Sequence, residues 1–190
     1  MKILVILVFL LLASFSFSAD KTKTPPIDQK LKSILKKAIE DSSSFTDKFD
    51  AEVWLVDMSG RLKKIVKDDQ ERLQILKFVH QEAHKVELSP ELVLAVIHVE
   101  SYFNRFAISR VGARGLMQIM PFWLKEIGHP NDNLFDIQTN LRFGCTILKY
   151  YLDKEKGNLT RALARYNGSL GKFKYPNKVF KARTKNWYKL

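Results

Sequence analysis

Apolar residues recur at helical spacing along most of this 190-residue chain, and an alternating strand pattern never persists beyond a few residues. The stripe of Ala51, Leu55, Met58 and Leu62 is one example, although Gly60 weakens the helix prediction there. The periodicity predicts helices over residues 31–39, 51–65, 73–83, 90–100, 120–127, 137–154 and 159–166. The expected fold class is therefore mainly α.

Residues suited to helix N-caps precede three of these segments. Asp68 or Asp69 can cap the helix that contains residues 73–83, and Asn158 can cap the last helix. Ser89 gives the strongest start signal, because Pro90 follows it at the first helical position, where proline is favoured.

The helix that begins after Ser89 is unusually apolar and ends in a single acid, Glu100. A helix that is apolar on all sides is a buried one, and its C-terminal end carries the negative pole of the helix dipole. Both effects disfavour a charged carboxylate, so we expect them to raise the pKa of Glu100. A carboxylic acid that stays protonated near neutral pH suits general acid catalysis. The alternative is an ordinary helix-end glutamate paired with Arg105 or Arg110.

Polar groups and glycines follow Glu100 in a pattern that favours a binding cleft. Gly112 and Gly115 allow the backbone to approach a ligand closely. The candidate contacting residues supply a hydroxyl, amides, adaptable apolar surface and an aromatic ring: Ser109, Met117, Gln118, Met120, Tyr166 and Asn167. An acid combined with these groups is the chemistry of a sugar-binding cleft.

The composition of the chain predicts where the protein is located and what kind of partner it binds. Lys2 is followed by an apolar run over residues 3–13 and then by small residues, which predicts a signal peptide over residues 1–18, with an uncleaved membrane anchor as the alternative.

The net charge is +12, and residues 156–190 hold ten Lys and Arg residues but no acid. Such a basic tail suits nucleic acid or another polyanion, and for an exported protein the polyanion is the cell envelope. Cys145, the only cysteine, is expected in the core.

The chain resembles the soluble lytic transglycosylases, which act in bacterial cell-wall turnover. Their Glu-Ser-x-Phe signature stands at residues 100–103, and the serine that follows it is Ser109. The block Gly-Ala-x-Gly-Leu-Met-Gln-Ile-Met-Pro occupies residues 112–121 without a gap, and the later Ala-x-x-x-Tyr-Asn block occupies residues 162–167. The match covers about residues 89–171. Many members continue with Ala-Gly, whereas this chain has Gly168 and Ser169.

The resemblance implies a lysozyme-like, α-rich fold with an irregular or short β segment between Tyr102 and Arg114. It implies that Glu100 is the single acid/base, that Ser109 and Asn167 hold an N-acetyl group or carbonyl of the muramyl sugar, and that the sugar subsites are lined by Met117, Gln118, Met120 and Tyr166. The expected reaction is non-hydrolytic cleavage of the β-1,4 bond between N-acetylmuramic acid and N-acetylglucosamine, which leaves a 1,6-anhydro end. No metal or organic cofactor is implied.

These expectations define the domains, the partners and the place of action. Residues 1–18 form the signal peptide, residues 19–70 a linker with accessory helices, and residues 71–190 the catalytic domain with its basic tail. The expected partners are peptidoglycan glycan strands, the anionic cell envelope and membrane-associated wall machinery, and nucleic acid is not among them. We expect the mature protein in the periplasm or cell envelope.

Three other functions compete with this reading. His80 and His84 have zinc-ligand spacing, but Gln81 stands where the metalloprotease motif needs glutamate. A goose-type-lysozyme-like hydrolase has the same fold, although ordinary glycosidases use two carboxylates and the next acids here are Glu126, Asp132 and Asp136. A non-catalytic wall-binding protein with a basic tail is the third possibility.

Overall fold

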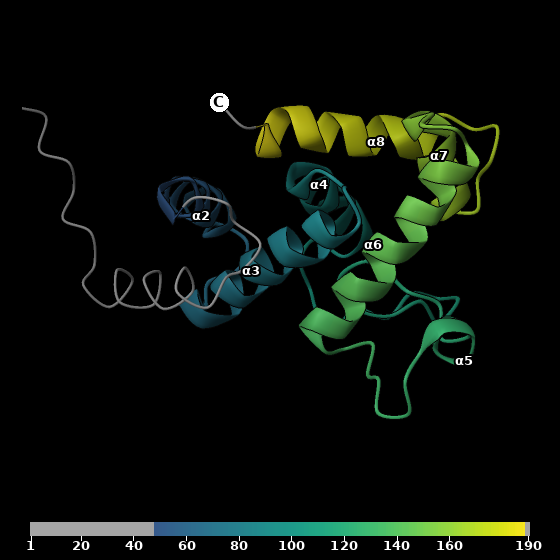
Figure 1. The fold of residues 1–190 in the computed structure, drawn as a ribbon, viewed down its shortest axis with the longest axis horizontal. Coiled ribbons are helices and arrows are strands. Elements are labelled where there is room, and N and C mark those ends of the chain that lie inside the picture. Colours follow the sequence, from purple (N-terminus) through teal and green to yellow (C-terminus); the bar gives the residue numbers. More distant parts are fainter. Residues whose placement is uncertain (1–47, 189–190) are drawn as a thin grey trace, which may run out of the picture.

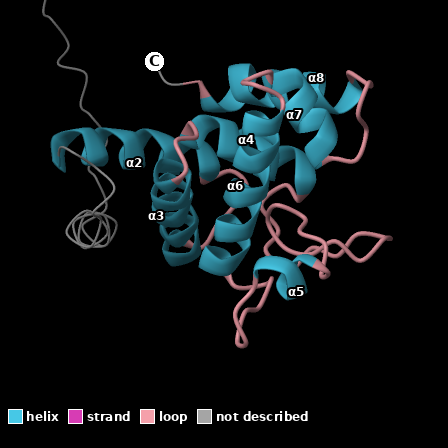
Figure 2. Cartoon of the chain, turned by 45° about the vertical axis from the view of Figure 1, so that its right-hand side comes forward, coloured by secondary structure: helices cyan, strands magenta, loops and turns pink. Residues whose placement is uncertain are grey.

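The structure is a computed structural model that describes residues 48–188, and the predicted signal peptide and the predicted helix at residues 31–39 lie outside this part. The described part is built from helices joined by irregular loops (Figures 1 and 2), so the mainly-α prediction is confirmed. The helices are α2 (Lys48–Leu62), α3 (Asp69–Lys85), α4 (Pro90–Glu100), α5 (Trp123–Ile127), α6 (Ile137–Lys154), α7 (Leu159–Tyr166), α8 (Lys174–Ala182) and the π-helical segment η1 (Arg183–Trp187). None of the helices between residues 48 and 188 is long and apolar enough to cross a membrane.

Helix α4 is the buried centre of the molecule. Ser89 caps it by accepting a hydrogen bond from the Leu92 N–H, and Pro90 occupies its first turn, as the sequence predicts. Every residue from Leu92 to Ile97 is buried, and α3, α8 and η1 pack around the helix. The apolar surroundings end where α4 ends, at Glu100.

Helix α6 supports the loops that follow α4. Asp136 caps α6, and Cys145 is buried in it as predicted. Gly144 lets α6 approach the loop closely, because a Cβ at this position would lie 2.1 Å from the Met117 Sδ atom. Helices α3 and α7 pack on other sides of α6, so α6 connects the N-terminal and C-terminal helices.

The basic C-terminal segment folds as part of the core. Its apolar residues Tyr175, Val179 and Ala182 are buried on one face of α8, and Trp187 in η1 is 1% exposed. Helix α8 lies across α4 in Figure 1, and these two helices are in extensive contact. The sequence pattern predicted only a tail here, because lysines and Pro176 interrupt the apolar spacing.

The segment between α4 and α5 is irregular, in agreement with the expectation for residues 102–114. Its only pairings among the described residues are isolated bridges of Arg114 with Ile108 and with Ile119. The helix predicted from residue 120 begins later, at Trp123, because Met120 and Pro121 form turns whose carbonyls accept from Trp123 and Leu124. The loops gather on the side of the molecule that carries α5 (Figure 2).

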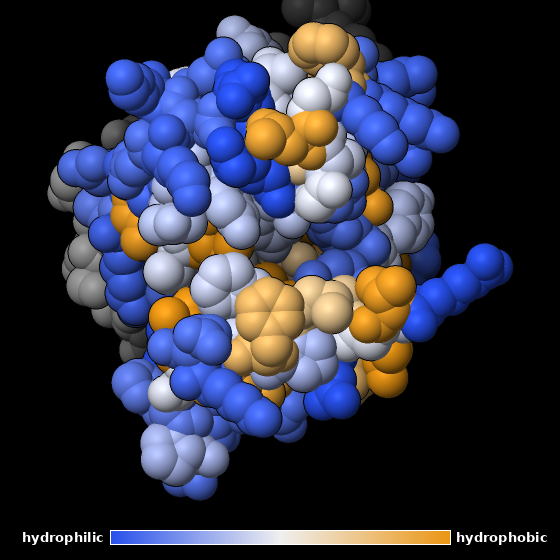
Figure 3. Space-filling view, turned by 90° about the vertical axis from the view of Figure 1, so that its right-hand side faces the viewer, coloured by the Kyte–Doolittle hydropathy of each residue, from blue (hydrophilic) through white to orange (hydrophobic). Residues whose placement is uncertain are grey.

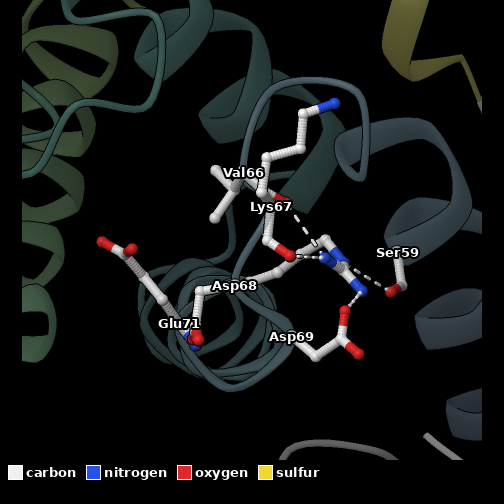
Figure 4. Close-up of polar contacts among 7 residues, drawn as sticks. Ser59, Val66, Lys67, Asp68, Asp69 and Glu71 are labelled. Atoms are coloured by element: carbon white, nitrogen blue, oxygen red, sulfur yellow. Dashed lines mark hydrogen bonds and ion pairs between the residues drawn. The ribbon is translucent and has the colours of Figure 1, made fainter.

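Helix α2 is joined to α3 by one buried cation, Arg72, which is 0% exposed. Its guanidinium donates to the Ser59 hydroxyl at 3.0 Å and to the Val66 carbonyl at 2.9 Å, and it pairs with Asp69. Figure 4 shows Ser59, Val66, Lys67 and Asp69 converging on this group. Because a buried charge is stable only when it is paired and hydrogen-bonded, Arg72 holds the α2–α3 turn in place.

We expect Arg72→Ala to lower the free energy of unfolding by about 2–4 kcal/mol, because it removes buried volume and leaves buried acceptors unsatisfied. Urea denaturation followed by circular dichroism measures this loss. Lys67→Ala is the matched control, because the Lys67 side chain is exposed, and it should change stability by less than about 0.5 kcal/mol. Equal stabilities of the two variants would contradict the role of Arg72.

Candidate active site

Glu100 lies mostly buried at the C-terminal end of α4, and the Tyr175 hydroxyl donates a 2.6 Å hydrogen bond to its Oε1 atom. Burial raises the pKa of Glu100 from 4.5 to about 7, and the hydrogen bond from Tyr175 opposes this shift. No ion pair in the described part of the chain involves Glu100, so the alternative pairing with Arg105 or Arg110 is not found there. The carboxyl group can therefore hold or release a proton near neutral pH.

Two tyrosines interact with Glu100: Tyr175 is buried and Tyr166 is half-buried. Burial and the charge of Glu100 raise the pKa values of Tyr166 and Tyr175 well above 10, so both hydroxyls stay protonated. Tyr175 comes from α8 and Tyr166 from the last residue of α7. The Tyr166 hydroxyl donates to the Met117 carbonyl at 2.8 Å and thereby ties α7 to the loop after α4.

Asn140 of α6 holds the same loop from the other side. This side chain is 1% exposed, and its Oδ1 accepts a 2.8 Å hydrogen bond from the Met117 N–H. Its Nδ2 donates to the carbonyls of Arg114 and Leu134. Gly115 has a positive φ of 77°, and a Cβ there would lie 2.2 Å from the Asn140 Nδ2 atom. The glycine is required because any side chain would displace this clamp.

Ser109 and Gln118 shape the loop and keep polar groups free. The Ser109 oxygen accepts a 3.0 Å hydrogen bond from the Ala113 N–H, so its own hydrogen remains available to donate. The Gln118 Nε2 group donates to the carbonyls of Ala107 and Gly115, which uses its two hydrogens. Its Oε1 atom remains available to accept a hydrogen bond from a ligand hydroxyl.

The other predicted site residues differ in exposure. Met120 is half-buried, and Asn167 is exposed at the C-cap of α7. The Met117 side chain, in contrast, is 0% exposed and packs against Gly144 of α6. Met117 therefore contributes to the core and, through its backbone, to the loop clamp, and its side chain presents no surface to a ligand.

The acids that follow Glu100 in the sequence have other partners or face solvent. Asp132 accepts from the His129 N–H and pairs with Arg142, and Asp136 caps α6. Glu126 is exposed on α5. None of these three carboxylates is hydrogen-bonded to Glu100 or Tyr175 in the described residues.

The histidines suspected of metal binding lie elsewhere. His80 and His84 stack on each other on α3 with ring centroids 6.3 Å apart, and His80 also packs against Trp54. Residues 48–188 contain no cluster of three or more His, Cys, Asp or Glu side chains that could hold a metal ion.

Two residues of this arrangement were missed by sequence reasoning. Tyr175 is separated from Glu100 by 75 positions, and it lies in the segment interpreted as a tail. Its burial could have been suspected from the spacing of Tyr175, Val179 and Ala182. Asn140 occupies a buried position of α6, and a polar residue inside the apolar stripe of a helix was the available signal.

The face of the molecule on which α5, α6 and α7 lie is hollowed across its middle (Figure 3). Hydrophilic side chains dominate above the hollow, and apolar side chains lie inside it and along its lower edge. Exposed apolar side chains of the loop segment include Phe106, Ile108, Val111 and Phe122. This surface combines a hydrophilic rim with apolar contact area.

The family model described as the transglycosylase SLT domain matches residues 77–188, which is more than half of the chain. A transglycosylase of Enterobacteria phage PRD1 is 37% identical over 101 residues, covering 50% of this chain and 37% of the phage protein. Membrane-bound lytic murein transglycosylase C of Photorhabdus laumondii is 30% identical over 119 residues, covering 54% of this chain and 33% of that protein. The chain matches little more than a third of the length of these curated relatives.

Two solved structures described as lytic transglycosylases also match this chain, with lower sequence identity than the relatives above. An inactive mutant of lytic transglycosylase Slt from Pseudomonas aeruginosa is 20% identical, covering 82% of this chain and 31% of its own, with a TM-score of 0.45. The 70 kDa soluble lytic transglycosylase of Escherichia coli is 19% identical, covering 75% of this chain and 31% of its own, with a TM-score of 0.40.

The raised pKa of Glu100 predicts a pH-dependent stability. Between pH 4.5 and about 7 the native state keeps a proton that the unfolded chain has released. The free energy of unfolding should therefore fall as pH rises through this window, by up to about 3 kcal/mol. Glu100→Gln should lose this slope and be more stable than the wild type at pH 8. Urea denaturation at several pH values tests this, with Glu126→Gln as the exposed-acid control, and parallel curves for Glu100→Gln and wild type would contradict it.

The hydrogen bond from Tyr175 should set how far the pKa of Glu100 rises. Tyr175→Phe removes a bond that stabilises the carboxylate, so the pKa of Glu100 should increase by about one further unit. A carbon-13 NMR titration of the Glu100 carboxyl measures the shift directly. Tyr166→Phe is the control, because the Tyr166 hydroxyl bonds to a backbone carbonyl instead, and a larger shift in Tyr166→Phe would refute the assignment.

Proposed function

The chain belongs to the transglycosylase SLT domain family, and on that basis we propose that it is a peptidoglycan lytic transglycosylase. It cleaves the β-1,4 bond between N-acetylmuramic acid and N-acetylglucosamine without adding water. Glu100 acts as the single acid and base. The observation that carries the proposal is a buried carboxyl group with a pKa of about 7, placed at the end of an apolar helix beside a tyrosine hydroxyl.

The first step is protonation of the leaving group. Protonated Glu100 gives its proton to the glycosidic oxygen as that oxygen leaves the muramyl anomeric carbon. A pKa near 7 suits this step, because a sizeable fraction of the enzyme holds the proton at neutral pH. The hydrogen bond from Tyr175 then stabilises the carboxylate that remains.

The second step uses groups of the sugar itself. The N-acetyl oxygen of the muramyl residue stabilises the positive charge at the anomeric carbon, oriented by the free hydroxyl hydrogen of Ser109 and by Asn167. The Glu100 carboxylate then takes the proton of the C6 hydroxyl, whose oxygen bonds to the anomeric carbon. The first proton leaves with the N-acetylglucosamine hydroxyl, and the C6 proton restores the acid form of Glu100, so no water is consumed. A nucleophile on the same sugar has a high effective concentration, which favours this route over hydrolysis.

Two of the acids that follow Glu100 in the sequence already have partners, which supports a single-acid mechanism over the two-carboxylate mechanism of a hydrolase. Asp132 is held by Arg142 and Asp136 by the start of α6, so neither is hydrogen-bonded at the Glu100 site. Most retaining and inverting glycosidases use a second carboxylate beside the scissile bond. In the proposal, Gln118, Met120 and the ring of Tyr166 contact the sugars around that bond.

The substrate determines where the protein acts. Peptidoglycan lies outside the cytoplasmic membrane, so the proposal places the enzyme in the periplasm or cell envelope. The apolar run over residues 3–13 has the length of the apolar core of a signal peptide, and such a signal would direct export. The same location would allow contact with membrane-associated wall machinery.

Digestion of sacculi in ¹⁸O-labelled water tests the reaction. We expect muropeptides that end in 1,6-anhydro-N-acetylmuramic acid, carry no label and are about 18 mass units lighter than hydrolysed products, because the C6 hydroxyl replaces water. Label at the muramyl anomeric carbon would mean hydrolysis. Glu100→Gln is the matched control, and it should lower turnover by about 10²–10⁴-fold while binding to sacculi persists. Turnover within threefold of wild type would remove Glu100 from the mechanism.

A further inference from the structure

A row of lysines follows the outer face of α8 and η1. Lys178, Lys181 and Lys185 recur at spacings of three and four residues, which places them on one side of the helix, and all three are exposed. The adjacent side of the helix carries the buried residues Val179 and Ala182, and Ala182 also lines the cavity beside the lysines. No ion pair among residues 48–188 involves any of these three lysines. Their charges are therefore uncompensated.

The lysine row forms one wall of a groove. Two adjoining cavities of about 510 and 610 Å³ lie beside α8, and both are lined by His98, Tyr102, Lys185 and Asn186. Because they share these residues, the cavities form a continuous groove that extends from Lys178 on α8 to Lys64 beyond the end of α2. We call it the lysine groove.

Positive charge dominates the lysine groove. Its one carboxylate, Asp57, is bound by Arg61 through two 2.8 Å hydrogen bonds, so these two charges cancel. Burial lowers the pKa of His98, which keeps its ring uncharged at neutral pH. Lys64 and the three lysines of the row remain, and none of the four has an ion-pair partner among the described residues. The groove therefore selects an anionic ligand.

The groove adjoins the candidate active site, although Glu100 lines neither of its two cavities. Val99, which lines one cavity, directly precedes Glu100 in α4. Lys178 comes three residues, or about one helical turn, after Tyr175, whose hydroxyl contacts the Glu100 carboxyl. These two links place the groove within about one helical turn of the residues that surround the Glu100 carboxyl.

We propose that the lysine groove binds the carboxylate-bearing peptide stem attached to the muramyl sugar of the substrate, so that the enzyme prefers stem-bearing glycan over bare glycan. This inference rests on the proposed function. The length of the row fits, because residues 178–185 of a helix rise about 10 Å, and an extended peptide covers that distance with three or four residues. Lysines bind the stem carboxylates, and the Asn186 amide and the Tyr102 hydroxyl can bond its peptide groups.

The shape and composition of the groove disfavour other polyanions. A flat membrane surface can touch the exposed lysines of the row, but it cannot enter the groove to bond the half-buried Asn186. Single-stranded nucleic acid binds best to several stacked aromatic rings, whereas Tyr102 is the one strongly exposed aromatic residue lining this groove.

The first test measures binding of a fluorescently labelled stem tetrapeptide with free carboxylates to the mature protein. The free-carboxylate peptide should bind at least about tenfold tighter than the same peptide with amidated carboxylates, and binding should weaken with salt. The triple variant Lys178→Gln, Lys181→Gln, Lys185→Gln should lose about tenfold or more. The control variant Lys67→Gln, Lys125→Gln, Lys154→Gln removes the same charge from exposed positions outside the groove and should stay within twofold of wild type. Equal losses in both variants, or equal affinity for an oligonucleotide of the same charge, would overturn the proposal.

The second test compares cleavage of stem-bearing glycan with cleavage of glycan from which an amidase has removed the stems. The triple variant should raise KM for stem-bearing glycan several-fold, leave its kcat unchanged, and leave bare glycan unaffected. If wild type cleaves both substrates with equal KM, the stem assignment is wrong while the proposed function stands. If wild type cleaves neither substrate, the proposed function fails, and the peptide-binding test still decides what the groove binds.

Discussion

The burial of the middle of α4, residues 92–97, is the constraint on which the rest of the structure depends. Because residues 92–97 are apolar on every side, α3, α8 and η1 must cover the helix all round, and the fold is arranged to do so. Glu100 occupies the position where this apolar cover ends. Its raised pKa therefore comes mainly from desolvation by the packing and not from a charged neighbour, and the Tyr175 hydroxyl is its one hydrogen-bond partner among the described residues.

The loop that follows Glu100 has no regular secondary structure. Side chains from neighbouring helices form the hydrogen bonds that a helix or strand would otherwise supply to its backbone. Asn140 of α6 accepts from the Met117 N–H, and Tyr166 of α7 donates to the Met117 carbonyl. Both backbone groups of one residue are thus satisfied from two different helices. Gly115 and Gly144 make these contacts possible, because side chains at either position would push the loop away. An irregular loop held in this way can present polar groups as rigidly as a strand does.

Local signals in the sequence were enough for most of the helices, although they missed α8 and η1, and they were insufficient for the contacts between helices. The bounds of α6 and α7 and the caps Ser89 and Asn158 agree with the predictions, because capping and periodicity act over a few residues. Glu100 was recognised as unusual from its apolar helix alone. Tyr175 was missed because its partner lies 75 positions away, and Arg72 because its acceptors are mostly backbone carbonyls and a hydroxyl. Such long-range polar contacts leave no periodic pattern.

Helix α8 explains why a row of lysines without ion-pair partners lies close to the acid whose pKa is raised by burial. One face of α8 is apolar because it covers α4 and brings Tyr175 to Glu100, so the charged residues of α8 lie on its remaining surface. Helical periodicity then turns an apparently unstructured basic tail into an ordered row of lysines beside Val99. Helix α8 therefore makes the surroundings of the Glu100 carboxyl group less polar. About one helical turn from Tyr175, the same helix makes the electrostatic potential more positive. A neutral acid and an anion-attracting surface can coexist at that distance because the lysines are solvated and screened, whereas Glu100 is not.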